Sequence, residues 1–163
     1  MKRKPGYFMT TIFGIAVVLV AINPVFASQA LAADKSPGTA QSPSPPQVQW
    51  TRTFGGDGFD SGQSVRQTLD GGYIIAGTTT SFGAGGKDIF LVKTNSAGNL
   101  TWSRTFGGQG DDFGYSVQPI PDGGYIIAGY TNSFGAGGMD IYLVKTDSSG
   151  NMTWQKTFGG GWN

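Results

Sequence analysis

The stretch Trp50-Thr51-Arg52-Thr53-Phe54-Gly55-Gly56 decides the fold, because it returns twice at an interval of 52 residues. Its second copy is Trp102-Ser103-Arg104-Thr105-Phe106-Gly107-Gly108, and its third is Trp154-Gln155-Lys156-Thr157-Phe158-Gly159-Gly160. A period of this length indicates a structural unit that cannot bury its own apolar face and has to stack on neighbouring units. We therefore expect a repeat region over residues 50–163, with units at about 50–101 and 102–153 and a partial third unit at 154–163.

Each unit contains four short apolar stretches separated by glycine-rich turns. Asp70-Gly71-Gly72 is a hairpin signal and residues 81–86 form a longer Gly-rich loop, and both recur 52 residues later. In Tyr73-Ile74-Ile75-Ala76-Gly77 both alternating faces are apolar, so we expect neither side of this sheet to meet water. The strands expected in the first unit, each with an equivalent 52 residues later, are residues 64–68, 73–79, 88–94 and 100–106.

Composition favours strands over helices, since the chain has 28 glycines in 163 residues and no Glu. We expect an all-β fold made of two four-stranded antiparallel propeller-type blades plus one extra N-terminal strand over residues 50–54. Closed propellers have about four to eight blades, so this propeller is incomplete. The chain is therefore either a truncated copy of a longer propeller or a protomer of a ring that several copies close together.

Longer motifs recur around this core: Asp-Gly-Gly-Tyr-Ile-Ile-Ala-Gly, Ser-Phe-Gly-Ala-Gly, Asp-Ile-x-Leu-Val-Lys-Thr and Gly-Asn-x-Thr-Trp. With Trp-x-x-Thr-Phe-Gly-Gly they resemble the beta-propeller repeat of secreted and cell-surface proteins of bacteria and archaea. The resemblance covers about residues 50 to 160. It implies a propeller fold and an extracellular location, and the family has no single agreed activity.

The N-terminal part predicts export. Residues 1–33 form a signal peptide, with the basic Lys2-Arg3-Lys4, an apolar run over residues 8–22, and candidate cleavage sites after Ala27 and Ala32. The alternative is an uncleaved membrane anchor, but the apolar run is shorter than the roughly 20 residues that span a bilayer, so we expect cleavage and no membrane span after it. Residues 34–49 form a Pro/Ser-rich linker. The expected location is secreted or cell surface.

Several function classes lack the residues they need. The chain has no His and no Cys, which excludes Ser-His and Cys-His catalysis and the usual zinc sites. No phosphate-binding loop opens a helix, and we expect neither enzymatic activity nor a cofactor. After residue 33 eight basic residues face ten acidic ones, which leaves no basic stripe for nucleic acid.

The repeated tryptophans are candidate ligand-binding residues. The faces of Trp50, Trp102 and Trp154 could stack on sugar rings, and repetition would multiply such sites. The alternative is that the rings pack in the blades and recur because the fold recurs.

Two aspartates are candidate metal ligands. Asp60 and Asp112, with Asp57 and Asp111 nearby, could hold Ca²⁺, although calcium requires about six to eight oxygen ligands and no Asp-x-Asp-x-Asp-Gly run is present. The alternative is that these carboxylates cap the glycine turns through backbone hydrogen bonds.

The turn before each repeated tryptophan carries two further signals. Asn99-Leu100-Thr101 and Asn151-Met152-Thr153 are glycosylation sequons, with Asn99 and Asn151 as the acceptors. The same turns look similar to the Asp-box turns of other propellers, in which Asp147, or Asn95 through its amide oxygen, would order the hairpin.

These features predict a non-enzymatic, secreted or cell-surface propeller-repeat protein with a structural, adhesive or binding role. The alternative is a small carbohydrate-binding lectin whose two-blade protomers assemble into a closed ring. The partners expected are other copies of the chain, cell-surface components or glycans.

Overall fold

The computed structural model describes residues 47–161, and the predicted signal peptide and residues 34–46 of the linker lie outside this range. Residues 47–161 form strands, turns and extended segments without a helix, so the predicted all-β class is confirmed. No helix long and apolar enough to cross a membrane occurs in this part of the chain. The strands are β1 (Asp60–Gln67), β2 (Tyr73–Thr79), β3 (Asp88–Thr94), β4 (Leu100–Phe106), β5 (Asp112–Pro119), β6 (Tyr125–Thr131), β7 (Asp140–Thr146) and β8 (Met152–Phe158).

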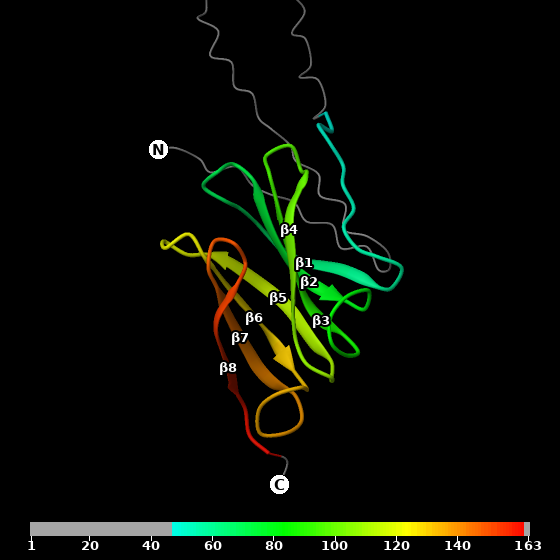
Figure 1. Ribbon diagram of the computed structural model, residues 1–163, viewed down its shortest axis with the longest axis vertical. Helices are drawn as coiled ribbons and strands as arrows, with labels where there is room; N and C mark the ends of the chain where they lie inside the picture. The colour runs from blue at the N-terminus through cyan, green and yellow to red at the C-terminus, as the bar shows by residue number, and fades with distance from the viewer. Residues whose placement is uncertain (1–46, 162–163) are drawn as a thin grey trace, which may run out of the picture.

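The strands form two separate four-stranded sheets, as the repeat predicts. Strands β1 to β4 make the first sheet and β5 to β8 the second, and each strand pairs antiparallel with the next along the chain (Figure 1). The β1–β2 and β5–β6 turns contain Gly71 and Gly123, whose φ angles of 78° and 85° favour glycine. The prediction of two four-stranded antiparallel sheets is confirmed.

The first strand of each sheet begins earlier than the sequence predicts. Strand β1 starts at Asp60 and not at Ser64, because the register shifts between Gly62 and Ser64 and lets residues 60–62 pair with residues 77–79. Strand β5 starts at Asp112 and carries the same shift. An extra residue at such a bulge breaks the period of two, so the pattern of apolar residues hides this part of the strand.

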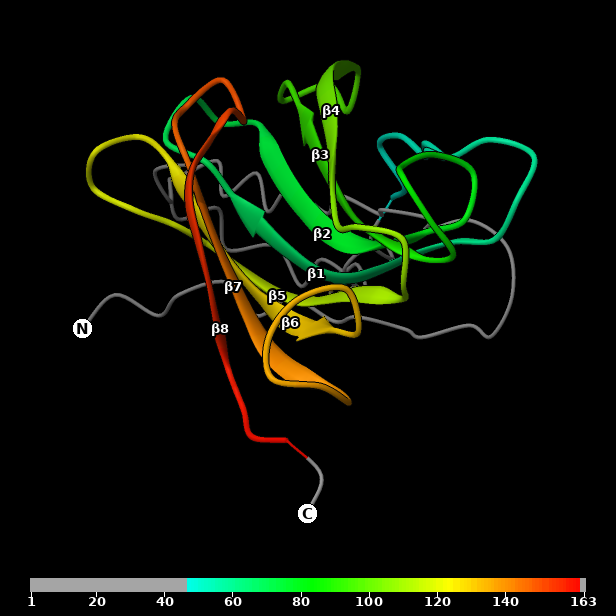
Figure 2. The same cartoon turned by 60° about the horizontal axis from the view of Figure 1, so that its bottom comes forward.

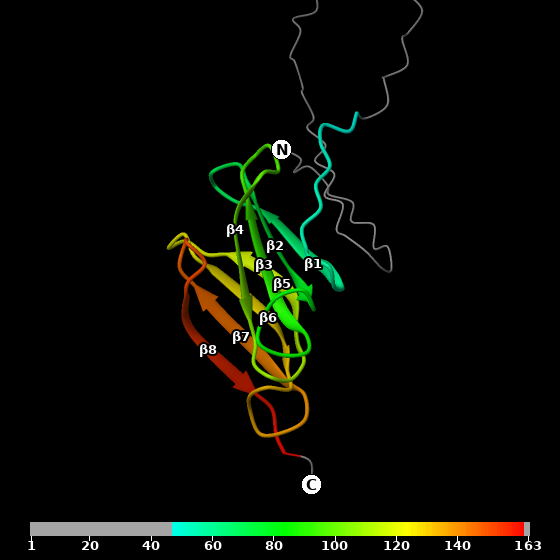
Figure 3. The same cartoon turned by 45° about the vertical axis from the view of Figure 1, so that its right-hand side comes forward.

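The extra N-terminal strand predicted over residues 50–54 is not formed. These residues are the counterparts of residues 102–106 in β4, which pair with β3. The described residues contain no strand that could take the place of β3 for residues 50–54, and a strand exists only with a partner. Figure 3 shows this cyan segment on the side of the first sheet opposite to the second sheet.

The two sheets stack face to face, and we call their contact the sheet junction. Strand β5 lies against β1, β2 and β3 of the first sheet (Figure 2). A buried cluster fills the junction, with Trp102 and Phe134 packed at its margin. Burial of these side chains is the main source of stability that the structure offers. They are Ile74, Ala76, Ile89, Leu91 and Phe106 of the first sheet and Val117, Tyr125, Ile127, Tyr142 and Val144 of the second.

The second sheet is covered on one side only, whereas the first sheet, for which the sequence predicts that neither side meets water, buries Ile74, Ile75 and Ala76. Ile141 is 55% exposed, whereas Ile89, its counterpart 52 residues earlier, is 0% exposed. In the described residues no third sheet follows β8, so this side has no neighbour. We call it the open face; its apolar residues are Ile126, Ala128, Ile141 and Leu143, the counterparts of Ile74, Ala76, Ile89 and Leu91.

Candidate functional site

The open face carries aromatic side chains that have no counterpart in the first sheet. Phe113, Tyr115 and Tyr130 cluster with ring centroids 4.8 to 6.3 Å apart. The equivalent positions of the first repeat hold Ser61, Gln63 and Thr78. Tyr115 and Tyr130 are exposed, so the open face is a contiguous apolar and aromatic surface of the kind that marks an interaction site.

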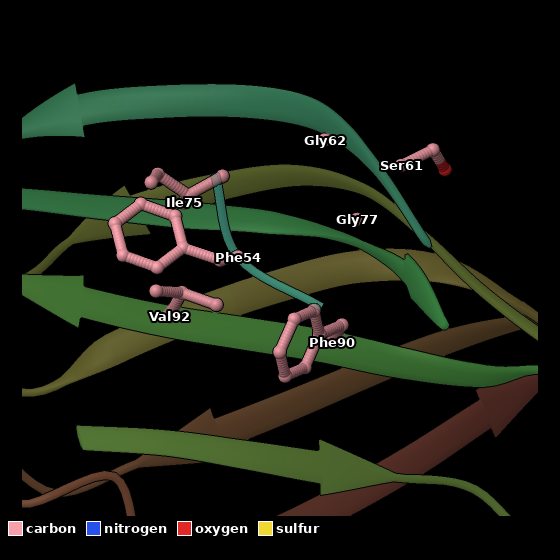
Figure 4. A pocket seen from close by; sticks show the side chains of 7 residues that line it. All are labelled: Phe54, Ser61, Gly62, Ile75, Gly77, Phe90 and Val92. Atoms are coloured by element: carbon pink, nitrogen blue, oxygen red, sulfur yellow. The ribbon is translucent and has the colours of Figure 1, made fainter. Parts of the chain in front are cut away.

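The opposite end of the molecule is the far side of the first sheet, which we call the receiving face. Its apolar residues Tyr73, Ile75, Phe90 and Val92 are the counterparts of the four residues that β6 and β7 contribute to the sheet junction. Phe54 packs on this face, over a cavity of about 10 Å³ that has room for about one water molecule (Figure 4). The receiving face is therefore covered by a single segment of chain instead of by a sheet.

The repeated tryptophans follow the packing of the sheets. Trp50 packs edge-on against Tyr73 with ring centroids 5.7 Å apart, and Trp102 packs in the same way against Tyr125 at 5.9 Å. Trp154 is exposed, with Lys156 Nζ 5.7 Å from its ring. The three rings lie at three successive positions along the stack of sheets, and the structure does not bring them together into one site.

The candidate metal ligands Asp60 and Asp112 begin β1 and β5 and are buried. Oδ2 of Asp60 accepts hydrogen bonds from the Gly56 amide at 2.9 Å and the Ser81 hydroxyl at 2.7 Å. Oδ2 of Asp112 accepts the equivalent pair, from the Gly108 amide at 2.8 Å and Ser133. These contacts are those of a carboxylate that orders a glycine turn. Residues 47–161 contain no group of three or more acidic, His or Cys residues placed to hold a metal ion.

Asp112 has a neighbour that sequence reasoning did not identify, the carboxylate of Asp88. A Cβ atom added to Gly107 would lie 2.2 Å from Asp88 Oδ1 and 2.6 Å from Asp112 Oδ2, so both carboxylates crowd this glycine. Burial raises the pKa of Asp88, and the charge of Asp112 also raises it. Hydrogen bonds from the Gly85 and Ala84 amides lower this pKa, but the net shift is upward. Burial also raises the pKa of Tyr142 to about 12, with both carboxylates adding to the effect.

The turns that carry the sequons are ordered as the sequence predicts. The side-chain oxygen of Asn95 accepts hydrogen bonds from the Ala97 and Asn99 amides, both at 3.0 Å. Asp147 accepts from the Ser149 and Asn151 amides at 2.9 and 2.8 Å. The predicted role of Asn95 and Asp147 in these hairpins is therefore confirmed. Both sequon asparagines are exposed.

One ion pair occurs in both sheets, and the exposure of its lysine differs between the covered and the uncovered sheet. Lys93 and Lys145 occupy the same repeat position and bind Asp70 and Asp122 at 2.7 and 2.8 Å. The Lys93 side chain is 7% exposed and the Lys145 side chain 29%. Lys93 lies on the junction side of the first sheet and Lys145 on the open face, so the second sheet accounts for the difference.

We expect Asp70→Asn to destabilise the chain by about 1 kcal/mol, because the buried Lys93 ammonium loses its carboxylate partner. The hydrogen bonds from Lys93 and then Thr68 lower the pKa of Asp70 from 3.8 to about 2. The stabilisation is therefore complete above about pH 4 and is lost as the pH falls toward about 2. The measurement is urea unfolding of wild type and variant at several pH values.

Asp122→Asn is the matched control for this prediction. Its partner Lys145 is partly exposed, so we expect little change in the unfolding free energy. An equal loss in the two variants would contradict the role assigned to burial of Lys93.

A contact between loops at one end of the sheet junction was also missed from the sequence. Lys87 Nζ lies 3.7 Å from Asp111 Oδ2, and the Asp112 amide donates to the Lys87 carbonyl at 2.6 Å. The counterparts of Lys87 and Asp111 are Met139 and Phe59, which lie on the two unjoined ends of the molecule and are both exposed. Residue spacing alone carried no signal for this contact.

A hollow of about 190 Å³ lies beside Asp60, lined by residues 53–56 and 58–60. The equivalent region beside Asp112 is filled by the loop of residues 84–88 from the first sheet. The Lys87 amide donates a hydrogen bond to Asp111 Oδ1, and the Lys87 carbonyl accepts one from the Asp112 amide. The hollow is thus the place in which a preceding sheet would put its loop.

No protein-family model matches this chain, and no curated protein matches it.

Proposed function

We propose that this chain is a non-enzymatic, secreted or cell-surface propeller-repeat protein with a structural or adhesive role. In this proposal the two sheets are propeller blades, and the open face is the surface through which the protein binds. The observation that carries the binding role is the contrast between Ile141, which is 55% exposed, and Ile89, which occupies the same repeat position and is 0% exposed.

The physical argument is the cost of leaving such a surface in water. The open face places aliphatic side chains of β6 and β7 beside an aromatic cluster, and solvent-facing apolar surface of this extent favours association. Export is supported by the basic start and the apolar run of the N-terminal region. The sequence resemblance to propeller repeats of secreted and surface proteins supports the same location.

The test is expression of the full chain in an exporting bacterium, followed by protease treatment of intact cells and measurement of the protein in the medium and on the cells. We expect the protein to be protease-accessible or released, and we expect Ile141→Lys to reduce the cell-bound fraction. Leu69→Lys is the control, since Leu69 is fully exposed in a turn away from the open face. A protein that stays inside the cell, or equal retention of both variants, would contradict the proposal.

A further inference from the structure

The two unjoined surfaces of the molecule are counterparts of the two surfaces that meet at the sheet junction. The open face of the second sheet repeats the junction side of the first sheet, as Ile141 repeats Ile89. The receiving face of the first sheet repeats the junction side of the second, as Phe90 repeats Tyr142. Two different surfaces on opposite ends of one molecule, each the repeat counterpart of one side of the junction, are the arrangement from which a head-to-tail contact between copies is built.

The loops next to these surfaces have changed in a matched way. At the junction the charged pair Lys87 and Asp111 is in contact. At the unjoined ends both members of the pair are replaced by apolar residues, Met139 on the second sheet and Phe59 on the first. A change in one member alone would leave a charge against an apolar side chain, whereas the two changes together preserve a complementary contact.

The loop before β7 lacks the contact that its counterpart, the loop before β3, makes with the next sheet. A Cβ atom added to Gly85 would lie 2.3 Å from the Gly108 carbonyl oxygen, because the loop before β3 presses against the start of the second sheet. The counterpart Gly137 has nothing within 4 Å of the equivalent position. The adjacent Ala136 amide donates to Asp140 at 2.8 Å, as the Ala84 amide donates to Asp88 at 3.1 Å. The uncovered loop therefore keeps the hydrogen bond to Asp140 but differs from the covered loop in its backbone, since Gly137 and Gly138 have φ angles of 106° and 74° and Gly85 and Gly86 have no positive φ.

We propose that a second copy of this chain docks its receiving face on the open face, in the arrangement of the sheet junction, with Met139 of one copy against Phe59 of the other. The contact deepens the binding role proposed above, on which it rests, by naming the partner. It also covers the aromatic cluster of Phe113, Tyr115 and Tyr130, which the first repeat lacks.

The N-terminal segment, residues 50–56, competes with this docking. At the junction, residues 102–108 are the end of β4 and the two glycines after it, and Phe106 packs in the buried cluster there. Phe54 packs on the receiving face in the equivalent way. In the docked pair the same place belongs to residues 154–160 of the other copy, whose Trp154 and Phe158 are exposed in the single chain. Docking therefore displaces the N-terminal segment, which sets the concentration at which copies associate.

The first test measures self-association of the chain as an exporting host produces it, by sedimentation velocity over a concentration series. We expect wild type to associate as concentration rises and Phe59→Asp to weaken association at least about tenfold. Adding Met139→Lys to Phe59→Asp restores association, because the double variant has the charge pair found at positions 87 and 111. A wild type that stays monomeric throughout, or a double variant as weak as Phe59→Asp, would overturn the proposal.

The second test addresses the competition. We expect the variant Trp50→Ser with Phe54→Ser to associate more tightly, and Trp154→Ser with Phe158→Ser to associate more weakly. Thermal unfolding followed by circular dichroism establishes which variants are folded. If the Trp50→Ser, Phe54→Ser variant folds but associates no more tightly than wild type, the competition is overturned. If that variant does not fold, unchanged association of the Trp154→Ser, Phe158→Ser variant overturns it. If the protein is monomeric but still binds cells through Ile141, self-docking is refuted and the proposed function is retained.

Discussion

Ile89→Lys is expected to unfold the chain, whereas the same replacement at Ile141 leaves the free energy of unfolding nearly unchanged. Both residues occupy the same position of the repeat, and only Ile89 is covered by another sheet. A Lys ammonium at position 89 would be buried without a partner among apolar side chains, and the isoleucine packing would be lost. Together these effects cost more than about 4 kcal/mol, which is a large part of the stability of a small domain.

At Ile141 the new ammonium remains in water, so the expected change is within about 0.5 kcal/mol. The measurement is urea unfolding by circular dichroism at a low protein concentration, at which copies are dissociated. Strong destabilisation by Ile141→Lys under these conditions would contradict the assignment of the open face as uncovered in the single chain.

The repeat predicts the strands well and their surroundings poorly. Six of the eight strands begin and end as expected, because hairpin turns such as Asp70-Gly71-Gly72 limit them on both sides. Identical sequence in two repeats nevertheless implies identical local structure only. Whether Ile141 is buried depends on the next sheet, which is a property of the whole chain, and so the repeat pattern alone does not distinguish Ile141 from Ile89.

The local parts of the candidate site were predictable for the same reason. Asn95 and Asp147 order turns within a few residues of themselves, and the sequence is sufficient to identify such contacts. The approach of Asp88 to Asp112, and of Lys87 to Asp111, joins residues of different sheets. These contacts depend on the angle and offset at which the sheets stack, which the period of 52 residues does not encode.

The repeated phenylalanine provides the second large prediction, since its three copies differ mainly in what covers them. Phe106 is 8% exposed in the sheet junction, Phe54 is partly buried on the receiving face, and Phe158 is 51% exposed on β8. Replacement of a buried phenylalanine by alanine costs about 3 to 5 kcal/mol. We therefore expect Phe106→Ala to cost about 3 kcal/mol, Phe54→Ala about half of that, and Phe158→Ala less than about 1 kcal/mol.

The order of these three values separates two views of the repeat, and unfolding of the single chains by urea measures it. If the Trp-x-x-Thr-Phe-Gly-Gly motif stabilised each strand locally, all three variants would lose similar stability, because the motif is nearly identical in each copy. If the motif acts by packing on the following sheet, the loss of stability increases with the burial of the phenylalanine. Phe158→Ala then becomes costly only where a second copy covers β8. A loss for Phe158→Ala that is small in dilute protein and grows with concentration is the result expected from head-to-tail docking.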